Sequence, residues 1–138
     1  MINFHYEIDF NLINEASYSA WLSSVILFEQ KKEGEINYIF CDDAYLHKLN
    51  LQYLDHDNFT DIISFDYSLG NELHGDIFIS IERVTENAVD YDVSMEEELR
   101  RVMCHGILHY CGFKDKLEAD IIVMREKEDE MTALFSNQ

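Results

Sequence analysis

The stretch from residue 94 to residue 115, SMEEELRRVMCHGILHYCGFKD, contains the signals that begin and end one helix and two histidines close to its end. Ser94 and Glu97 match a capping box, in which the serine side chain accepts a hydrogen bond from the backbone N–H of the glutamate. The sequence predicts a helix from this box to about Cys111. Gly112 is expected to end it, because glycine readily adopts the left-handed conformation that turns the chain back.

Segments with alternating apolar residues and segments with apolar residues at helical spacing follow one another around this helix. Residues 2–10 alternate strictly, which predicts a half-buried strand. Asn14 is expected to cap a helix over residues 15–32, with Gly34 following its end. The other predicted elements are a strand at 36–41, a helix from Asp42 or Asp43, strands at 61–67 and 75–81 that could form a hairpin, a weak helix at 81–91 and a helix from about Leu117.

Strands and helices interleave without a strict strand–helix–strand repeat. This order predicts the α+β class, with a small mixed four-stranded sheet packed with about five helices and the histidine-bearing helix near the C-terminal third. The length of 138 residues fits one domain over residues 1–138. No segment approaches the ~20 apolar residues that span a membrane, and no signal-peptide pattern is present. With three sparse cysteines, we expect a cytoplasmic protein without a membrane partner.

The two histidines near the end of the predicted helix are four residues apart. Four residues turn a helix by roughly 400°, so His105 and His109 lie on one face, as in helices that hold zinc through two imidazoles. Asp115 follows the glycine turn, where a returning loop could bring it to the same metal ion. Cys104 and Cys111 point away from this row, and packing is the expected role of both. The remaining histidines lack paired spacing and are expected on the surface or on strand faces: His5, His47, His56 and His74.

The residue after the first histidine separates this motif from that of the zinc proteases. In the protease motif H-E-x-x-H, a glutamate at this position acts as the general base. Here the position is Gly106, so no carboxylate is ready to activate water for amide hydrolysis. A metal ion can itself make bound water acidic near neutral pH, which suits attack on a phosphodiester. The available carboxylates include Glu98, Glu118 and Asp120, and the sequence favours none of them as the general base.

The segment HGILHYCGFKD, residues 105–115, resembles the signature H-G-x-L-H-x-x-G-(Y/F)-D-H of the YbeY family of bacterial metal-dependent endoribonucleases. The segments LNLQY (49–53), TDIISF (60–65) and GDIFIS (75–80) match the family in the same order. The resemblance implies a zinc-dependent endoribonuclease that acts on single strands in rRNA maturation and ribosome quality control. It also implies RNA, in a ribosomal particle, as the partner, and one zinc ion per chain held by His105, His109 and the residue at position 115. If acidic residues surround this site, we expect RNA binding to need a further partner such as a ribosomal subunit or a ribosomal protein.

The chain departs from the family pattern at three positions. The third ligand position holds Asp115 in place of histidine, which keeps a competent ligand, adds a negative charge and lets harder ions such as manganese compete better. The residue before it is Lys114 in place of aspartate. Leu54 stands where many members place an arginine suited to hold a phosphate. The charge that would hold the phosphate is therefore either missing or supplied from elsewhere. Arg101, which lies one turn before His105 in the same row, is one candidate for substrate binding, and Lys114 and Lys116 beside the third ligand position are others.

The net charge of −18 works against binding to RNA, since phosphate contacts come from lysine and arginine. Four of the ten basic residues flank the histidine helix in sequence and could form a local positive patch: Arg100, Arg101, Lys114 and Lys116. Leu54 and the acidic charge leave open a non-enzymatic ribosome-associated factor with a structural zinc. The likeness of the histidine helix to that of zinc proteases leaves open a metal-dependent hydrolase of peptides or small molecules.

Overall fold

Four strands form one mixed sheet in the part of the chain that the computed structural model describes, residues 1–54 and 60–135. The strands lie in the order β1-β2-β4-β3, where β2 pairs in parallel with both β1 and β4, and β3 pairs antiparallel with β4. The predicted mixed sheet and the hairpin of its last two strands are confirmed. The strands are β1 (Ile2–Tyr6), β2 (Lys32–Cys41), β3 (Ile62–Asp66) and β4 (Glu72–Ser80).

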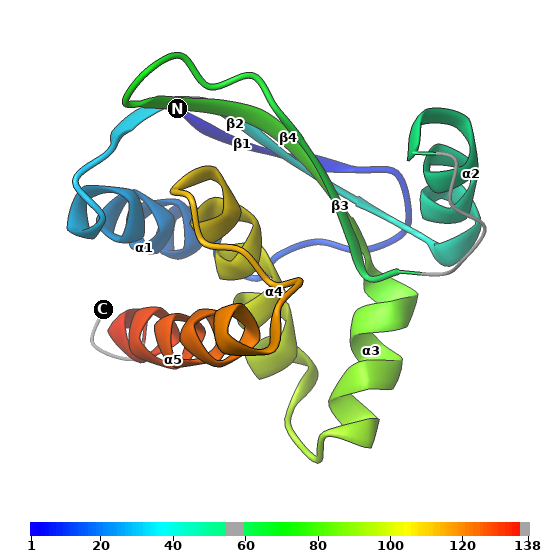
Figure 1. Ribbon diagram of the computed structural model, residues 1–138. Helices are drawn as coiled ribbons and strands as arrows, with labels where there is room; N and C mark the ends of the chain where they lie inside the picture. Colours follow the sequence, from blue (N-terminus) through cyan, green and yellow to red (C-terminus); the bar gives the residue numbers. More distant parts are fainter. Residues whose placement is uncertain (55–59, 136–138) are drawn as a thin grey trace.

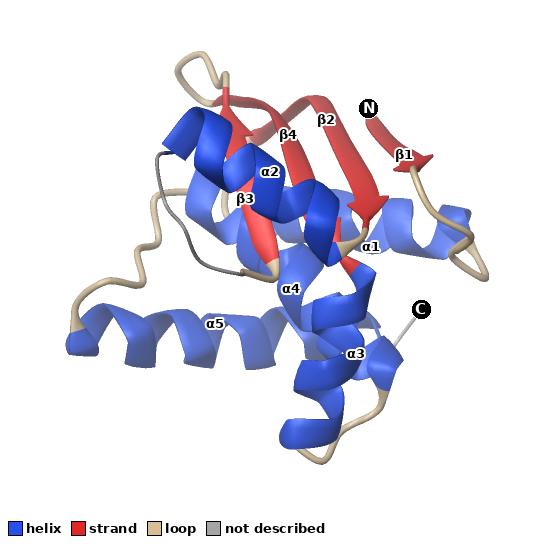
Figure 2. Cartoon of the chain, turned by 90° about the vertical axis from the view of Figure 1, so that its right-hand side faces the viewer, coloured by secondary structure: helices blue, strands red, loops and turns tan. Residues whose placement is uncertain are grey.

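Helices cover both faces of this sheet, as Figure 1 and Figure 2 show. Alternate side chains of β4 enter different clusters: Ile77 and Ile79 lie in the main core under α1 and α4, whereas Phe78 packs on the other side with Leu46 of α2. The predicted α+β class with five helices is thereby confirmed. The helices are α1 (Glu15–Phe28), α2 (Asp43–Leu54), α3 (Ile81–Asp90), α4 (Met95–Tyr110) and α5 (Glu118–Phe135).

Helix α4 lies at the centre of the main core, between the sheet and α5 (Figure 1). Its apolar face is almost fully buried, and two hydrogen bonds fix the layers around it. The Tyr38 hydroxyl of β2 donates to the Met103 carbonyl at 2.7 Å, and the indole N–H of Trp21 in α1 donates to the Met131 carbonyl of α5 at 2.8 Å. Each bond ties a buried polar group to a backbone acceptor, which removes the cost of leaving it unpaired.

The predicted start and end of α4 are confirmed. The Ser94 hydroxyl accepts a hydrogen bond from the Glu97 N–H at 3.1 Å. At the other end, Gly112 has φ +103°, and the N–H groups of Gly112 and Phe113 donate to the carbonyls of His109 and Leu108. This is the Schellman arrangement that reverses the chain after a helix.

Two of the predicted boundaries are wrong, one because a partner strand ends and the other because of the local backbone conformation. β1 ends at Tyr6, not at residue 10, because its partner β2 ends soon after Phe40, the residue opposite Tyr6. The apolar residues of 8–10 still pack against the core, which explains their alternation. Helix α1 ends at Phe28, not at residue 32, because Gln30 adopts the left-handed conformation at φ 61°. Gly34 does not follow this helix end but lies within β2.

The starts of two strands are also earlier than predicted. β2 begins at Lys32 and β4 at Glu72, because these residues pair with each other across an irregular register. Their polar side chains hid the strand in the sequence pattern. Within the described residues, no helix is both long and apolar enough to cross a membrane.

Gly75 of β4 leaves space for the end of α4, and replacing it with alanine is expected to destabilise the fold. A Cβ atom at this position would lie 2.2 Å from the Tyr110 hydroxyl oxygen and 2.5 Å from the Phe65 carbonyl oxygen. The Tyr110 hydroxyl donates to that same carbonyl at 2.9 Å, so the overpacked variant also strains this bond. We expect Gly75→Ala to lower the free energy of unfolding by about 1–3 kcal/mol in urea denaturation.

The matched control is the same substitution in a Tyr110→Ala background. Removing the ring makes room for the new methyl group, so the additional loss from Gly75→Ala is expected to be smaller there. An equal urea midpoint for Gly75→Ala and the parent protein would contradict the close contact between β4 and α4.

Candidate metal centre

Helix α4 and the loop after it bring three potential metal ligands together. The Nε2 atoms of His105 and His109 lie 3.1 and 3.2 Å from the same carboxylate oxygen of Asp115. The ligand atoms of the three residues all lie within 4.8 Å of one another, and each side chain is partly buried. The group therefore has the spacing of a site that could hold a metal ion.

The other ring nitrogen of each histidine has a partner that accepts hydrogen bonds. His105 Nδ1 donates to the Glu128 carboxylate at 2.5 Å, and His109 Nδ1 donates to the Phe113 carbonyl at 2.9 Å. With the proton held on Nδ1, a neutral imidazole presents a lone pair on Nε2. Two such lone pairs and a carboxylate oxygen repel one another unless a metal cation or a proton lies between them. The donor set thus fits a metal ion, with the outer hydrogen bonds that usually orient histidine ligands.

The turn after α4 explains how Asp115 reaches the histidines. Gly112 reverses the chain, and the Phe113 N–H donates to the Leu108 carbonyl while the Phe113 carbonyl accepts from His109. The next residues run back alongside the last turn of the helix. The same turn therefore orients one histidine and delivers the carboxylate.

A buried ion-pair cluster lies directly behind the histidines. The Arg101 guanidinium donates to both oxygens of Glu98, at 3.0 and 2.6 Å, and to Glu128 at 3.1 Å. Glu98 and Glu128 are each only 2% exposed. Burial raises the pKa of Glu128, but the hydrogen bond from His105 and the charge of Arg101 outweigh it and lower the pKa below its ordinary value. Glu128 thus remains an ionised acceptor that joins α5 to His105.

A cavity of about 320 Å³ opens onto the metal group. Thr60 and Asp61, which precede β3, line it together with Arg101 and the three candidate ligands. Burial raises the pKa of the Asp61 carboxyl group, and the charges of Arg101 and His105 oppose this shift. An oxygen of the Asp61 carboxyl group lies 3.9 Å from a guanidinium nitrogen of Arg101. The cavity therefore contains a fourth acidic or imidazole side chain, that of Asp61, beside the three candidate ligands.

A family profile described as Endoribonuclease YbeY matches residues 3–136. The chain belongs to this family. Proteins named Endoribonuclease YbeY from Flavobacterium johnsoniae and Flavobacterium psychrophilum are 65% and 67% identical to it over 135 residues, which cover 98% of this chain and 97% and 96% of the relatives. The solution structure of TM1509 from Thermotoga maritima matches with a TM-score of 0.73 and 25% identity, over 98% of this chain and 89% of that one.

Membership of the YbeY family confirms the predicted resemblance and the prediction of an enzyme, a nuclease of the hydrolase class. It argues against the peptidase alternative, and so does Gly106. This residue is buried against the sheet, where a Cβ atom would lie 3.0 Å from the Ile77 side chain. The position that carries the general base in zinc proteases therefore faces the core and away from solvent.

Several residues named from the sequence lie at or near the YbeY site. Arg101 lines the cavity, but its guanidinium is engaged by Glu98 and Glu128. Leu54 and Lys116 line a second cavity, of about 700 Å³, that also reaches His109 and Asp115. The loop before α5 exposes Lys114 and Lys116. The first turn of α5 contains the exposed Glu118 and the half-buried Asp120.

The other predicted roles concern cysteines and histidines outside the site. Cys104 lies in the main core and Cys111 packs against it, which confirms packing as their role. Burial raises the pKa of the Cys111 thiol to about 11. His5 and His74 lie on strands of the sheet and bond to Asn37 and Glu72, while His47 lies in α2. His56 lies outside the described residues.

Sequence reasoning missed Glu128 and Asp61 as residues of this site. Glu128 shared a helical stripe with the apolar Met124 and Met131, and a carboxylate in a buried stripe is a signal of a paired charge. Asp61 is the first residue of a β-rich run, and nothing in the sequence indicated that its side chain points toward the histidines.

Arg101→Met is expected to destabilise the protein strongly, because it leaves two buried carboxylates without their cation. Breaking a buried pair in this way costs about 3–5 kcal/mol. Because the folded-state pKa of Glu128 is lowered, its stabilising effect is complete above the ordinary value of 4.5 and is lost as pH falls through the folded value. Urea denaturation at neutral and acidic pH measures both effects, and the penalty of Arg101→Met should shrink with acid.

A matched control removes the carboxylates along with the cation. In Arg101→Met combined with Glu98→Gln and Glu128→Gln, most of the lost stability should return, since no buried charge is left unpaired. A single Arg101→Met variant as stable as the parent at neutral pH would show that this cluster does not support the fold.

Proposed function

We propose that this protein is a zinc-dependent endoribonuclease that cleaves single-stranded RNA in rRNA maturation and ribosome quality control. The observation that carries the proposal is the convergence of two Nε2 lone pairs and one carboxylate oxygen at the end of α4. Family membership supports the choice of RNA, because the relatives are named endoribonucleases. The proposed partners are rRNA in a ribosomal particle and a ribosomal protein.

The residues of the site would divide the work between holding a metal ion and positioning the substrate. His105, His109 and Asp115 would be the ligands, which leaves a position open for water or substrate, as in catalytic zinc sites. When bound there, zinc supplies Lewis acidity and a nucleophile at neutral pH. Glu128 and the Phe113 carbonyl hold the imidazoles in the ligating tautomer. Asp61, which lines the same cavity, would accept or return a proton during cleavage.

The third ligand bears on which metal the protein holds. Two histidines and one carboxylate form an accepted catalytic zinc set. The extra negative charge of Asp115 weakens the Lewis acidity of the metal relative to three histidines, and harder ions such as manganese tolerate carboxylate oxygens better. We therefore propose zinc as the bound ion and expect manganese to replace it in part.

Alanine substitution at each proposed ligand is expected to remove both metal and activity. Purified parent protein should contain about one zinc per chain, as three protein ligands suffice for a catalytic site. His105→Ala, His109→Ala and Asp115→Ala should each lose most of it, and cleavage of single-stranded RNA should fall by at least about a hundredfold. Elemental mass spectrometry and gel assays of a labelled RNA measure the two effects.

His5→Ala is the matched control, since His5 is exposed on β1 and bonds only to Asn37 among the contacts described. It should keep full metal content and activity. RNA cleavage that persists undiminished in His105→Ala or His109→Ala would overturn the proposal. Zinc-free parent protein that sediments with ribosomal particles and cuts no RNA would favour the non-enzymatic alternative.

A further inference from the structure

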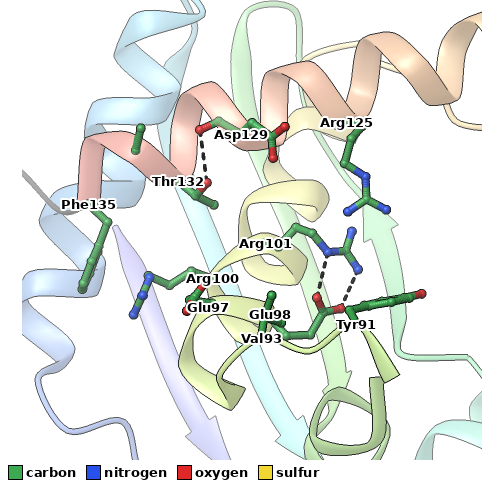
Figure 3. A pocket seen from close by; sticks show the side chains of 11 residues that line it. Tyr91, Val93, Glu97, Glu98, Arg100, Arg101, Arg125, Asp129, Thr132 and Phe135 are labelled. Carbon is green, nitrogen blue, oxygen red and sulfur yellow. Dashed lines mark hydrogen bonds and ion pairs between the residues drawn. The ribbon is translucent and has the colours of Figure 1, made fainter. Parts of the chain in front are cut away.

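A groove of about 610 Å³ is lined by residues of α4 and α5, among them Arg101, and none of the three proposed metal ligands lines it. Figure 3 shows its lining side chains, which come from both helices and from the segment after α3. Tyr91 and Phe135 provide aromatic surface at its two ends, and the exposed fraction of Tyr91 is 55%. The groove therefore offers apolar ring faces together with charged walls.

Three of the four arginines of the chain line this groove: Arg100, Arg101 and Arg125. Their environments differ. Arg101 is held by Glu98, and the Arg100 guanidinium lies over the Phe135 ring, 4.6 Å from its centre. The Arg125 side chain is 53% exposed, and its nearest ion-pair partner is Glu128 at 3.8 Å. Arg125 is thus the guanidinium best placed to contact a ligand in the groove.

The groove shares two arginines with a smaller cavity that reaches the candidate metal centre. This cavity, of about 220 Å³, is lined by Arg101 and Arg125 and also by His105 and Asp115. Arg125 therefore faces the groove on one side and the proposed metal ligands on the other. It thus lies where a chain-like ligand that is held at the metal group would approach the groove.

The charge of the groove differs from that of the whole chain. Its three arginines balance the three carboxylates in its lining, Glu97, Glu98 and Asp129, whereas the chain carries −18. Two of these carboxylates already have partners, since Glu98 binds Arg101 and Glu97 bonds with the Ser94 cap. A polyanion that reaches the metal centre therefore meets less repulsion along this path than over the acidic remainder.

We propose that the groove between α4 and α5 binds the segment of a single-stranded RNA that flanks the scissile phosphate. Arg125 contacts a backbone phosphate next to the cleaved bond, and Tyr91 stacks on a base further along the strand. Guanidinium groups that contact phosphates, combined with aromatic rings that stack on bases, are the usual means of binding a single strand without sequence preference. This proposal rests on the proposed function, since it takes RNA as the substrate.

The test measures binding of the zinc-supplied full chain to a labelled single-stranded RNA of roughly ten nucleotides, on ice, with a gel that checks that the RNA stays intact during the measurement. Arg125→Gln is compared with Lys32→Gln, which removes the same charge from an exposed position at the start of β2. We expect Arg125→Gln to weaken binding by about tenfold and to reduce the slope of log affinity against log salt by about 0.7, as for one lost phosphate contact. Lys32→Gln should change neither much, and Arg125→Lys should recover part of the loss.

Four outcomes separate this groove from the nuclease proposal. Arg125-specific loss of RNA binding in a protein that cleaves RNA supports both. Equal binding by the Arg125→Gln and Lys32→Gln variants, with cleavage intact in the parent, overturns the groove and leaves the nuclease. Arg125-dependent binding in a parent that cuts no RNA supports the groove and contradicts the nuclease. Displacement of the RNA by polyglutamate of equal charge overturns the groove as an RNA site and indicates an acidic peptide instead.

Discussion

The candidate metal centre depends on one buried carboxylate, Glu128. This residue reaches from α5 to α4, where it accepts hydrogen bonds from His105 and Arg101 while only 2% of it is exposed. Its charge is tolerated in the core because Arg101 neutralises it, and Arg101 in turn is held by Glu98. The ligating face of His105 is thus fixed by a contact between two helices and not by the histidine helix alone. Loss of the cation would disturb packing and site together.

The rest of the fold delivers the other two proposed ligands, His109 and Asp115, to the same point. The sheet supports α4 through its apolar face, and the left-handed turn at Gly112 returns the chain so that Asp115 lies against both histidines. The turn also supplies the Phe113 carbonyl that orients His109. The sheet and α5 therefore hold the donor atoms of the three side chains in place before a metal ion or substrate binds. Such preorganisation is the condition for a precise catalytic centre.

Local signals allowed much of this to be predicted. The cap at Ser94, the histidine pair and the glycine turn all act within a few residues, so the ends of α4 and the shared face of His105 and His109 were readable. The errors arose where distant segments decide the outcome. β1 stops where its partner strand runs out, and the polar starts of β2 and β4 are strands only because they pair with each other. Glu128 and Asp61 join the site from other elements, and no spacing rule links them to the histidines.

The most direct measurement of this dependence is the zinc affinity of Glu128→Gln, determined by competition with a chelator. Glutamine keeps the shape of the side chain but removes the charge that holds the His105 Nδ1 proton. Zinc binding should weaken by about 10–100-fold, as for other outer-sphere partners of histidine ligands. Glu126→Gln, an exposed position on the same helix, should bind zinc like the parent. Parent-like zinc affinity in a folded Glu128→Gln protein would contradict the role of this carboxylate in holding the centre.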